Sequence, residues 1–143
     1  MFVNVPSILK HEHRSPSYVS PDITAYDAIN VMASNEAGTV FVLNHGHLEG
    51  VFSPKDYGLR VALHGSVGKQ VRIDQVMTRS VVTVQRSEAI SHCMQIMLEN
   101  RIHYLPVVEL DTVLGVLTMG DILKALVSGH EFVIDHLEGY ARH

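Results

Sequence analysis

A hydroxyl residue followed three positions later by an aspartate occurs twice in this chain, each time directly after an apolar run that begins with glycine. The two copies are Gly50-Val51-Phe52-Ser53-Pro54-Lys55-Asp56 and Gly115-Val116-Leu117-Thr118-Met119-Gly120-Asp121. An ionised aspartate has two acceptor oxygens and no donor, so a single carboxylate can accept hydrogen bonds from both hydroxyls of a ribose diol. Asp56 and Asp121 are therefore candidates to hold such a diol, with the hydroxyls of Ser53 and Thr118 beside them.

The same spacing also has a purely structural interpretation. Ser/Thr-x-x-acid ahead of an apolar helix is the capping-box pattern. An aspartate in the first helical turn is also favoured by the helix dipole, by about 0.3–1 kcal/mol. One copy alone would favour the cap, whereas two copies at matching places in a repeated unit favour a binding role. The two interpretations are compatible with each other.

The repeat extends beyond the motif, because the two aspartates lie 65 positions apart and the apolar pattern around them recurs at that spacing. Two amphipathic helices are predicted from identical i, i+3, i+4, i+7, i+8 stripes. The first stripe is Ala25, Ala28, Ile29, Met32 and Ala33, and the second is Ile90, Cys93, Met94, Met97 and Leu98.

The expected order of elements is β-α-β-β-α, written twice. In the first repeat we expect a strand at 18–20, a helix opening at 21–22, a strand at 40–43, a turn at 44–47, a strand at 51–52 and a helix from 54. In the second we expect strands at 81–84, 104–108 and 113–117, a helix at 88–100, and a last helix behind Thr118 that continues through Tyr140. The expected division is a lead-in at 1–15, repeats at 16–65 and 81–128, a connector at 66–80 and a helical extension at 129–143.

The bulk composition narrows the classes of function. With 143 residues, 46% of them hydrophobic, the chain is the size of one domain. Each half, of roughly 50 residues, is too small to bury its own apolar face, so we expect the halves to pack on each other. A net charge of −4 without a basic run argues against a nucleic-acid partner. No apolar segment approaches the ~20 residues that span a bilayer, so we expect a cytoplasmic protein.

The cysteine and the histidine pairs are interpreted as structural or surface residues. The single cysteine, Cys93, lies on a helix stripe and is predicted to be a small buried hydrophobe. The pairs His11/His13 and His45/His47 lack further ligands, so surface histidines are favoured over a metal site. No nucleophile elbow, P-loop, Cys/His pair or dinucleotide fingerprint is present, so we predict neither catalysis nor a cofactor.

The complete pattern resembles a tandem pair of cystathionine β-synthase (CBS) domains over about residues 16–128. The resemblance rests on the two Gly-to-Asp motifs, on Met77-Thr78 ahead of Val81-Val82-Thr83-Val84, and on Tyr104-Leu105-Pro106-Val107-Val108 after the helix. It is looser in the first repeat, where Phe41 stands in the place of Pro106. It implies an α/β (α+β) fold in which two β-α-β-β-α repeats pack as one pseudo-twofold module. It also implies two clefts for adenosine ligands and a dimer of such modules.

The remaining ligand groups follow from charge and from the resemblance. A phosphate must point away from the aspartates, so Arg79, Arg101 and His103 are the candidate phosphate-binding cations in the second repeat. The resemblance places these residues at the phosphate end of the cleft and assigns adenine to the backbone near Tyr104 and Leu105 and near Val82 and Thr83. In the first repeat, Glu36 and Gly38 occupy the places of Arg101 and His103, which predicts that one cleft is weak or empty.

These observations predict a regulatory module that binds AMP, ADP, ATP, NAD or S-adenosylmethionine, senses energy or metabolite state without catalysis, forms a homodimer and acts on a regulated protein partner. Two alternatives stay open. One is a ligand-free dimerisation scaffold in which the motifs serve only as helix caps. The other is a metal-responsive protein that uses the histidine pairs.

Overall fold

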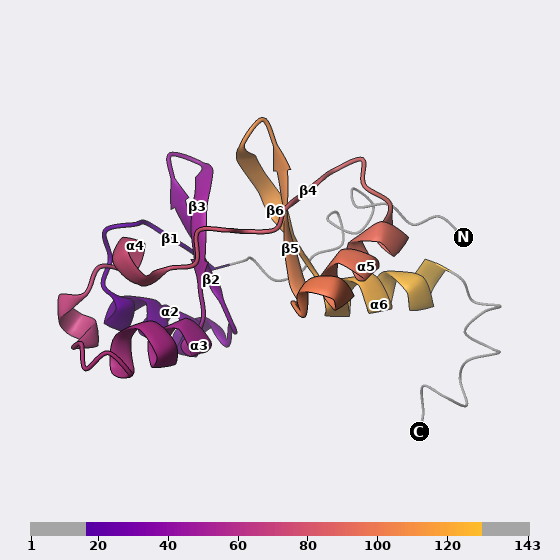
Figure 1. Ribbon diagram of the computed structural model, residues 1–143. Helices are drawn as coiled ribbons and strands as arrows, with labels where there is room; N and C mark the ends of the chain where they lie inside the picture. Colours follow the sequence, from indigo (N-terminus) through magenta and orange to yellow (C-terminus); the bar gives the residue numbers. More distant parts are fainter. Residues whose placement is uncertain (1–16, 130–143) are drawn as a thin grey trace, which may run out of the picture. The chain divides into compact units, whose positions relative to one another are not determined.

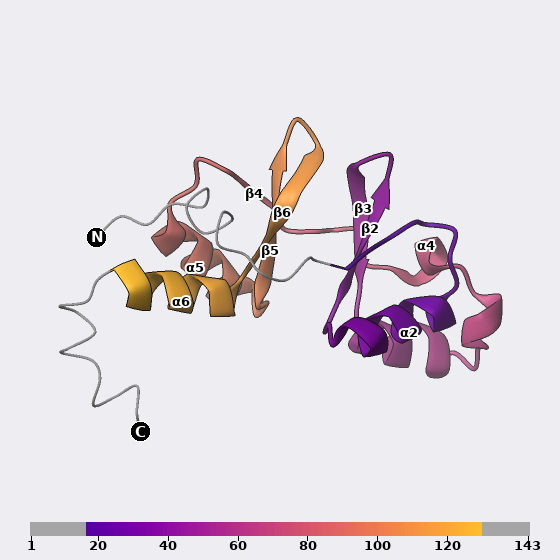
Figure 2. The ribbon, with the colours of Figure 1, turned by 180° about the vertical axis from the view of Figure 1, so that it is seen from behind.

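The computed structural model describes residues 17–129, which divide into two compact units. The first unit comprises residues 17–82 together with the turn at 110–113, and the second comprises residues 83–109 and 114–129. In Figures 1 and 2 the indigo and magenta elements belong to the first unit and the orange and yellow elements to the second. Each unit contains one copy of the predicted β-α-β-β-α order.

The first unit is built on three strands. They are β1 (Tyr18–Val19), β2 (Val40–Asn44) and β3 (His47–Phe52). β1 is parallel to β2, with Tyr18 opposite Phe41, and β2 is antiparallel to β3, with Val40 opposite Phe52. The β2–β3 turn is tight, and both His45 and Gly46 adopt positive φ angles. The predicted strands and turn are confirmed, with β3 starting earlier than expected.

Helix α2 (Ala25–Asn35) connects β1 to β2 and covers one face of these strands. It starts at Ala25 rather than at the expected positions 21–22, because Thr24 forms the N-cap and its Oγ1 accepts a hydrogen bond from Asp27 N at 3.0 Å. Three stripe residues, Ala25, Ala28 and Met32, are buried in the core of the first unit. Ala33, at the end of the predicted stripe, is exposed.

The segment after β3 belongs to the first unit and contributes Val61, Ile73 and Met77 to its core. Helix α3 (Pro54–Tyr57) runs into a π-helical turn η1 (Gly58–Ala62), followed by a 3₁₀ turn η2 (Gly68–Gln70) and helix α4 (Ile73–Val76). Ile73 is fully buried, and its backbone amide donates to Ile23 O at 2.8 Å. The expected connector therefore contains a 3₁₀ turn and a short helix, and it contributes buried residues to the core of the first unit.

The second unit repeats the pattern with β4 (Val84–Gln85), α5 (Ile90–Asn100), β5 (Tyr104–Glu109), β6 (Thr112–Thr118) and α6 (Met119–Gly129). β4 is parallel to β5, with Val84 opposite Val107, and β6 is the other neighbour of β5. The tight β5–β6 turn places Leu110 and Asp111 at positive φ.

Two sequence predictions for the second unit need correction. The strand expected at 81–84 is confined to β4, because Val81 N donates to Arg79 O at 3.0 Å in a local turn and so takes no part in the strand ladder. On α5, Ile90, Cys93 and Met97 are buried as predicted, but Leu98 is 70% exposed. The predicted lead-in at 1–15 lies outside the described residues. Of the predicted extension at 129–143, only residue 129, the end of α6, is described.

Candidate functional site

One end of the strand set in the second unit collects most of the predicted ligand-binding residues. β4 and β5 are parallel and therefore begin at the same end, and β6 ends there because it returns from the β5–β6 turn. The backbone confirms this proximity, since Met119 N donates to His103 O at 2.9 Å. The hydroxyl-Asp motif of the second repeat thus lies beside the start of β5.

Asp121 forms a helix cap with only part of its carboxylate. Thr118 N donates to Asp121 Oδ2 at 3.2 Å, and Asp121 N donates to Thr118 Oγ1 at 3.0 Å. Oδ1 has no hydrogen-bond or ion-pair partner among residues 17–129. Because a carboxylate offers about four acceptor positions, Asp121 can cap α6 and still accept hydrogen bonds from a ligand. The cap and the binding interpretation are therefore compatible at this position.

Asp56 has a different environment. Oδ2 accepts from Ser53 N at 3.0 Å and from Ser53 Oγ at 3.1 Å, and Asp56 N donates to Ser53 Oγ at 3.4 Å. Oδ1 accepts from Thr78 Oγ1 at 3.0 Å and lies 3.9 Å from Arg60 Nε. Both carboxylate oxygens are engaged within the first unit, and the side chain is only 15% exposed.

The other predicted residues fall into two groups. Thr83, His103, Tyr104 and Leu105 lie at the motif end of the second unit, at the starts of β4 and β5. The side chain of Leu105 is fully buried, so only its backbone is available to a ligand there.

The arginines and Val82 are less closely tied to this end. Arg101 is exposed and forms the left-handed C-cap of α5, with φ 55°. Arg79 and Val82 belong to the first unit, where Arg79 Nη2 donates to Asp74 O at 2.7 Å. The structure thus brings four of the seven predicted phosphate- and adenine-contacting residues to the Asp121 motif. Arg101 lies at the end of α5 in the same unit, and Arg79 and Val82 belong to the other unit.

Arg60 and Thr78 are functional neighbours of Asp56 that sequence reasoning missed. Arg60 carried a usable signal, since it lies at i+4 from Asp56 on a helix. Thr78 carried none, because it is 22 positions away and reaches Asp56 only through the fold of the connector.

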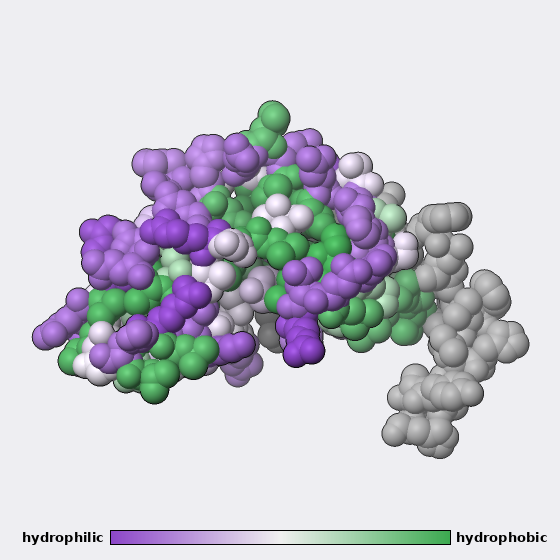
Figure 3. Space-filling view, in the orientation of Figure 1, coloured by the Kyte–Doolittle hydropathy of each residue, from purple (hydrophilic) through white to green (hydrophobic). Residues whose placement is uncertain are grey.

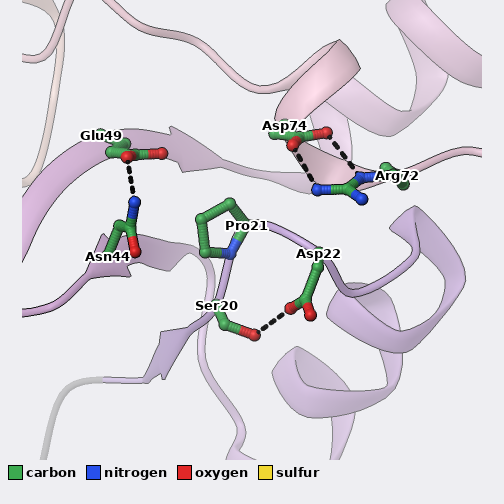
Figure 4. Close-up of a pocket in the computed structure, with 7 residues that line it drawn as sticks. All are labelled: Ser20, Pro21, Asp22, Asn44, Glu49, Arg72 and Asp74. Carbon is green, nitrogen blue, oxygen red and sulfur yellow. Dashed lines mark hydrogen bonds and ion pairs between the residues drawn. The ribbon is translucent and has the colours of Figure 1, made fainter.

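A separate polar cavity of about 380 Å³ lies in the first unit and was not predicted. Figure 4 shows its lining, which comprises Ser20, Pro21, Asp22, Asn44, Glu49, Arg72 and Asp74. Its polar groups pair with one another, as in the 2.6 Å bond from Ser20 Oγ to Asp22 and the 2.8 Å bond from Arg72 Nη2 to Asp74. The Ser20 hydrogen bond lowers the pKa of Asp22, assisted by a backbone hydrogen bond and by Arg72. The cavity lies by the end of β2, away from the Ser53–Asp56 motif that follows β3.

The histidine pairs and Cys93 do not form a metal site or a catalytic group among the described residues. His45 lies in the β2–β3 turn and His47 begins β3, and residues 17–129 contain no group of three or more side chains suited to a metal ion. His11 and His13 lie outside the described residues. Cys93 is buried as predicted, and burial, with the negative charge of Glu88, raises the pKa of its thiol to about 11. None of the helices described is long and apolar enough to cross a membrane.

Comparison with known sequences gives a consistent family match. The CBS domain profile matches residues 11–57 and 73–128. The chain is similar to the mitochondrial CBS domain-containing protein CBSX3 of Arabidopsis thaliana, with 27% identity over 86% of this chain and 62% of that protein. It is also similar to the CBS domain-containing protein YhcV of Bacillus subtilis, with 28% identity over 73% of this chain and 74% of that protein. The chain thus spans less than two thirds of the Arabidopsis protein.

Solved structures agree with the fold. A protein with CBS domains from Burkholderia ambifaria is 29% identical, covers 88% of this chain and 95% of its own, and has a TM-score of 0.78. The CBS domain pair of protein MJ0100, solved in complex with 5′-methylthioadenosine and S-adenosyl-L-methionine, has a TM-score of 0.71. It is 23% identical and covers 87% of this chain and 99% of its own, a similarity that bears on fold alone.

Proposed function

Because this chain belongs to the CBS-domain family, we propose that it is a cytoplasmic regulatory module that binds an adenosine ligand through the Thr118–Asp121 motif. CBS domain pairs are regulatory, ligand-binding modules, and the second unit repeats the motif on which such binding depends. The candidate ligands are AMP, ADP, ATP, NAD and S-adenosylmethionine. The module acts by binding and carries no catalysis of its own.

The observation that supports this proposal most directly is the state of the Asp121 carboxylate. Its Oδ2 completes the cap of α6, while its Oδ1 has no partner among the described residues. Hydrogen bonds to an ionised carboxylate are about twice as strong as neutral ones. A ribose diol that donates to Oδ1 therefore gains two charge-assisted hydrogen bonds without breaking the helix cap.

The rest of the ligand is assigned by charge and by position along the strands. The phosphate or other charged tail points away from Asp121, and Arg101 and His103 are the proposed cations of the second unit. The adenine ring lies against the backbone at Tyr104–Leu105 and at Thr83. Since the side chain of Leu105 is buried, the base is recognised there through main-chain groups.

Regulation requires that the ligand favour one conformation over another, because a ligand shifts an equilibrium only by its difference in affinity for the two states. We propose that the module works as a homodimer and passes this shift to a regulated protein partner. The CBS domain pair of MJ0100, which was solved with two adenosine compounds, has the same fold as this chain.

A thermal-shift panel with the five candidate ligands tests the proposal. At about 100 times its Kd, a ligand that binds only the folded state stabilises it by about 2.7 kcal/mol, which raises the melting temperature by about 8 °C for a chain of this size. The Asp121→Ala variant should lose this rise. Glu99→Ala, which removes one exposed carboxylate from α5, should keep it.

The alternative function that a specific observation favours is the ligand-free scaffold, since both hydroxyl-Asp motifs do form helix caps. Under that alternative no nucleotide changes the melting temperature, and Asp121→Ala merely destabilises the protein. A rise with zinc that His45→Ala weakens would instead indicate the metal-responsive protein.

A further inference from the structure

We propose that Asp56 fastens the segment 76–78 to the rest of the first unit instead of binding ribose. The chain consequently binds one adenosine ligand, at Asp121, rather than two. Asp56 holds the segment 76–78 onto the first unit through the side chains of Thr78 and Arg60. The statement about ligand number rests on the proposed function, whereas the fastening does not.

The contacts of Asp56 engage both of its oxygens and leave too few acceptor positions for both hydroxyls of a sugar diol. Oδ2 accepts two hydrogen bonds from Ser53, and Oδ1 accepts one from Thr78 Oγ1 and faces Arg60. A ribose diol would need to displace the Thr78 hydroxyl from a largely buried carboxylate. The net gain would be close to zero, because one hydroxyl donor is exchanged for another and the displaced hydroxyl loses its partner.

The Thr78 hydroxyl is also held in place by the backbone, which makes it a strong competitor. Val51 N donates to Thr78 O at 2.9 Å, and Thr78 N donates to Val51 O at 2.8 Å, so Thr78 is paired with β3. Arg60 Nη1 donates to Met77 O at 2.8 Å and to Val76 O at 3.3 Å. Arg60 therefore contacts both the carboxylate and the segment that the carboxylate fastens.

Gly50 belongs to the same arrangement. A Cβ at this position would lie 2.8 Å from Thr78 O and 2.6 Å from Met77 Sδ. The glycine of the first motif is thus what allows the segment to lie against β3. Gly50, Val51 and Asp56 of the first motif thus all lie against the segment.

The second repeat lacks the equivalent fastening among the described residues. Ala125 stands four positions after Asp121, in the place that Arg60 takes after Asp56. No described residue donates to Asp121 Oδ1. The first repeat is also less suited to a phosphate. Its helix α2 ends with Glu36 as the left-handed C-cap, where α5 of the second repeat has Arg101, and Glu36 would repel a phosphate.

Calorimetric titration with AMP and with S-adenosylmethionine tests the ligand number. We expect one site per chain in the wild type. Asp121→Asn should weaken binding at least about 10-fold, since the remaining amide cannot accept like a carboxylate. Asp56→Asn should keep both the single site and an affinity within about threefold of the wild type. Two sites per chain, or loss of a site in Asp56→Asn, would overturn the inference and leave the proposed function standing.

Thermal melting without ligand tests the fastening by itself. Asp56→Ala and Asp121→Ala each remove one helix cap, so their difference contains the contacts to Thr78 and Arg60 together with the additional hydrogen bond from Ser53 Oγ. We expect Asp56→Ala to lower the melting temperature by about 5 °C more than Asp121→Ala. Thr78→Val keeps the shape of the side chain and should lower the melting temperature in the wild type, but hardly at all in Asp56→Ala.

The control for this cycle is the same Thr78→Val change combined with Asp121→Ala, where the two effects should add. Equal losses for the two aspartate variants, with additivity in both pairs, would overturn the fastening. An absence of binding by all five candidate ligands would overturn the proposed function and the one-ligand statement together. The melting cycle would then still decide whether Asp56 fastens the segment.

Discussion

On Asp56, the carboxylate oxygen Oδ1 faces Thr78 and Arg60, whereas Oδ1 of Asp121 has no such neighbour among residues 17–129. The two residues share a motif, a helix position and a capping partner, so the motif alone predicts the same role for both. What separates them is one side chain at i+4 and one side chain brought in from a distant segment. The first difference is readable in the sequence as Arg60 against Ala125, and the second is not.

The Cys93 thiol provides a residue-scale prediction with a defined pH dependence. Burial and Glu88 raise its pKa from 9.0 to about 11, so the folded state holds the proton more tightly than the unfolded state does. Its contribution to stability is therefore complete below about pH 9 and is lost as the pH rises toward 11. At pH 8 a thiol reagent should label native protein far more slowly than protein in denaturant.

The check is a time course of labelling with and without urea, together with urea melts at several pH values in this range. Cys93→Ser is a poor comparison because it buries a new hydroxyl, so Cys93→Ala serves as the control that should lose this pH dependence. Fast labelling of native protein would contradict the buried assignment.

At the scale of elements, the period of the apolar residues was sufficient to predict α2 and α5, and turn chemistry was sufficient for the two hairpins. The start of α2 was placed too early even though Thr24-x-x-Asp27 has the same capping pattern as the two motifs. The structure of the connector was beyond sequence reasoning, because α4 owes its place to the burial of Ile73 and to hydrogen bonds with residues near Ile23. Such long-range contacts leave no local pattern.

Gly50 gives a prediction at this scale. Because an added methyl group would meet Thr78 O at 2.8 Å, Gly50→Ala must push the segment 76–78 away from β3. We expect a loss of about 1–3 kcal/mol in the free energy of unfolding, measured by urea denaturation. Gly38→Ala, where a Cβ would meet nothing within 4 Å, is the matched control and should change stability little. Similar losses for both variants would show that segment 76–78 does not constrain position 50.

At the scale of the whole molecule, size, charge and apolar content set the class of protein and the family resemblance set the fold, and both required only the sequence. Our expectation that the two halves pack on each other remains a prediction, as does the homodimer. The exposed apolar residues supply a reason to expect self-association, because large exposed apolar patches often mark interaction sites. Figure 3 shows apolar surface over the α6 region of the second unit.

Helix α6 is the element on which the homodimer is best tested. Leu123 and Val127 are 51% and 53% exposed and lie four residues apart, so they share one face of the helix. In a dimer formed through this face, Leu123→Glu would bury a carboxylate without a partner, a change that strongly disfavours association. Light scattering should give about twice the 15.9 kDa chain mass for the wild type and a value near the chain mass for Leu123→Glu. Gln95→Glu, which adds the same charge on the exposed side of α5, should leave the mass of the wild type unchanged, and a monomeric wild type would refute the expected dimer.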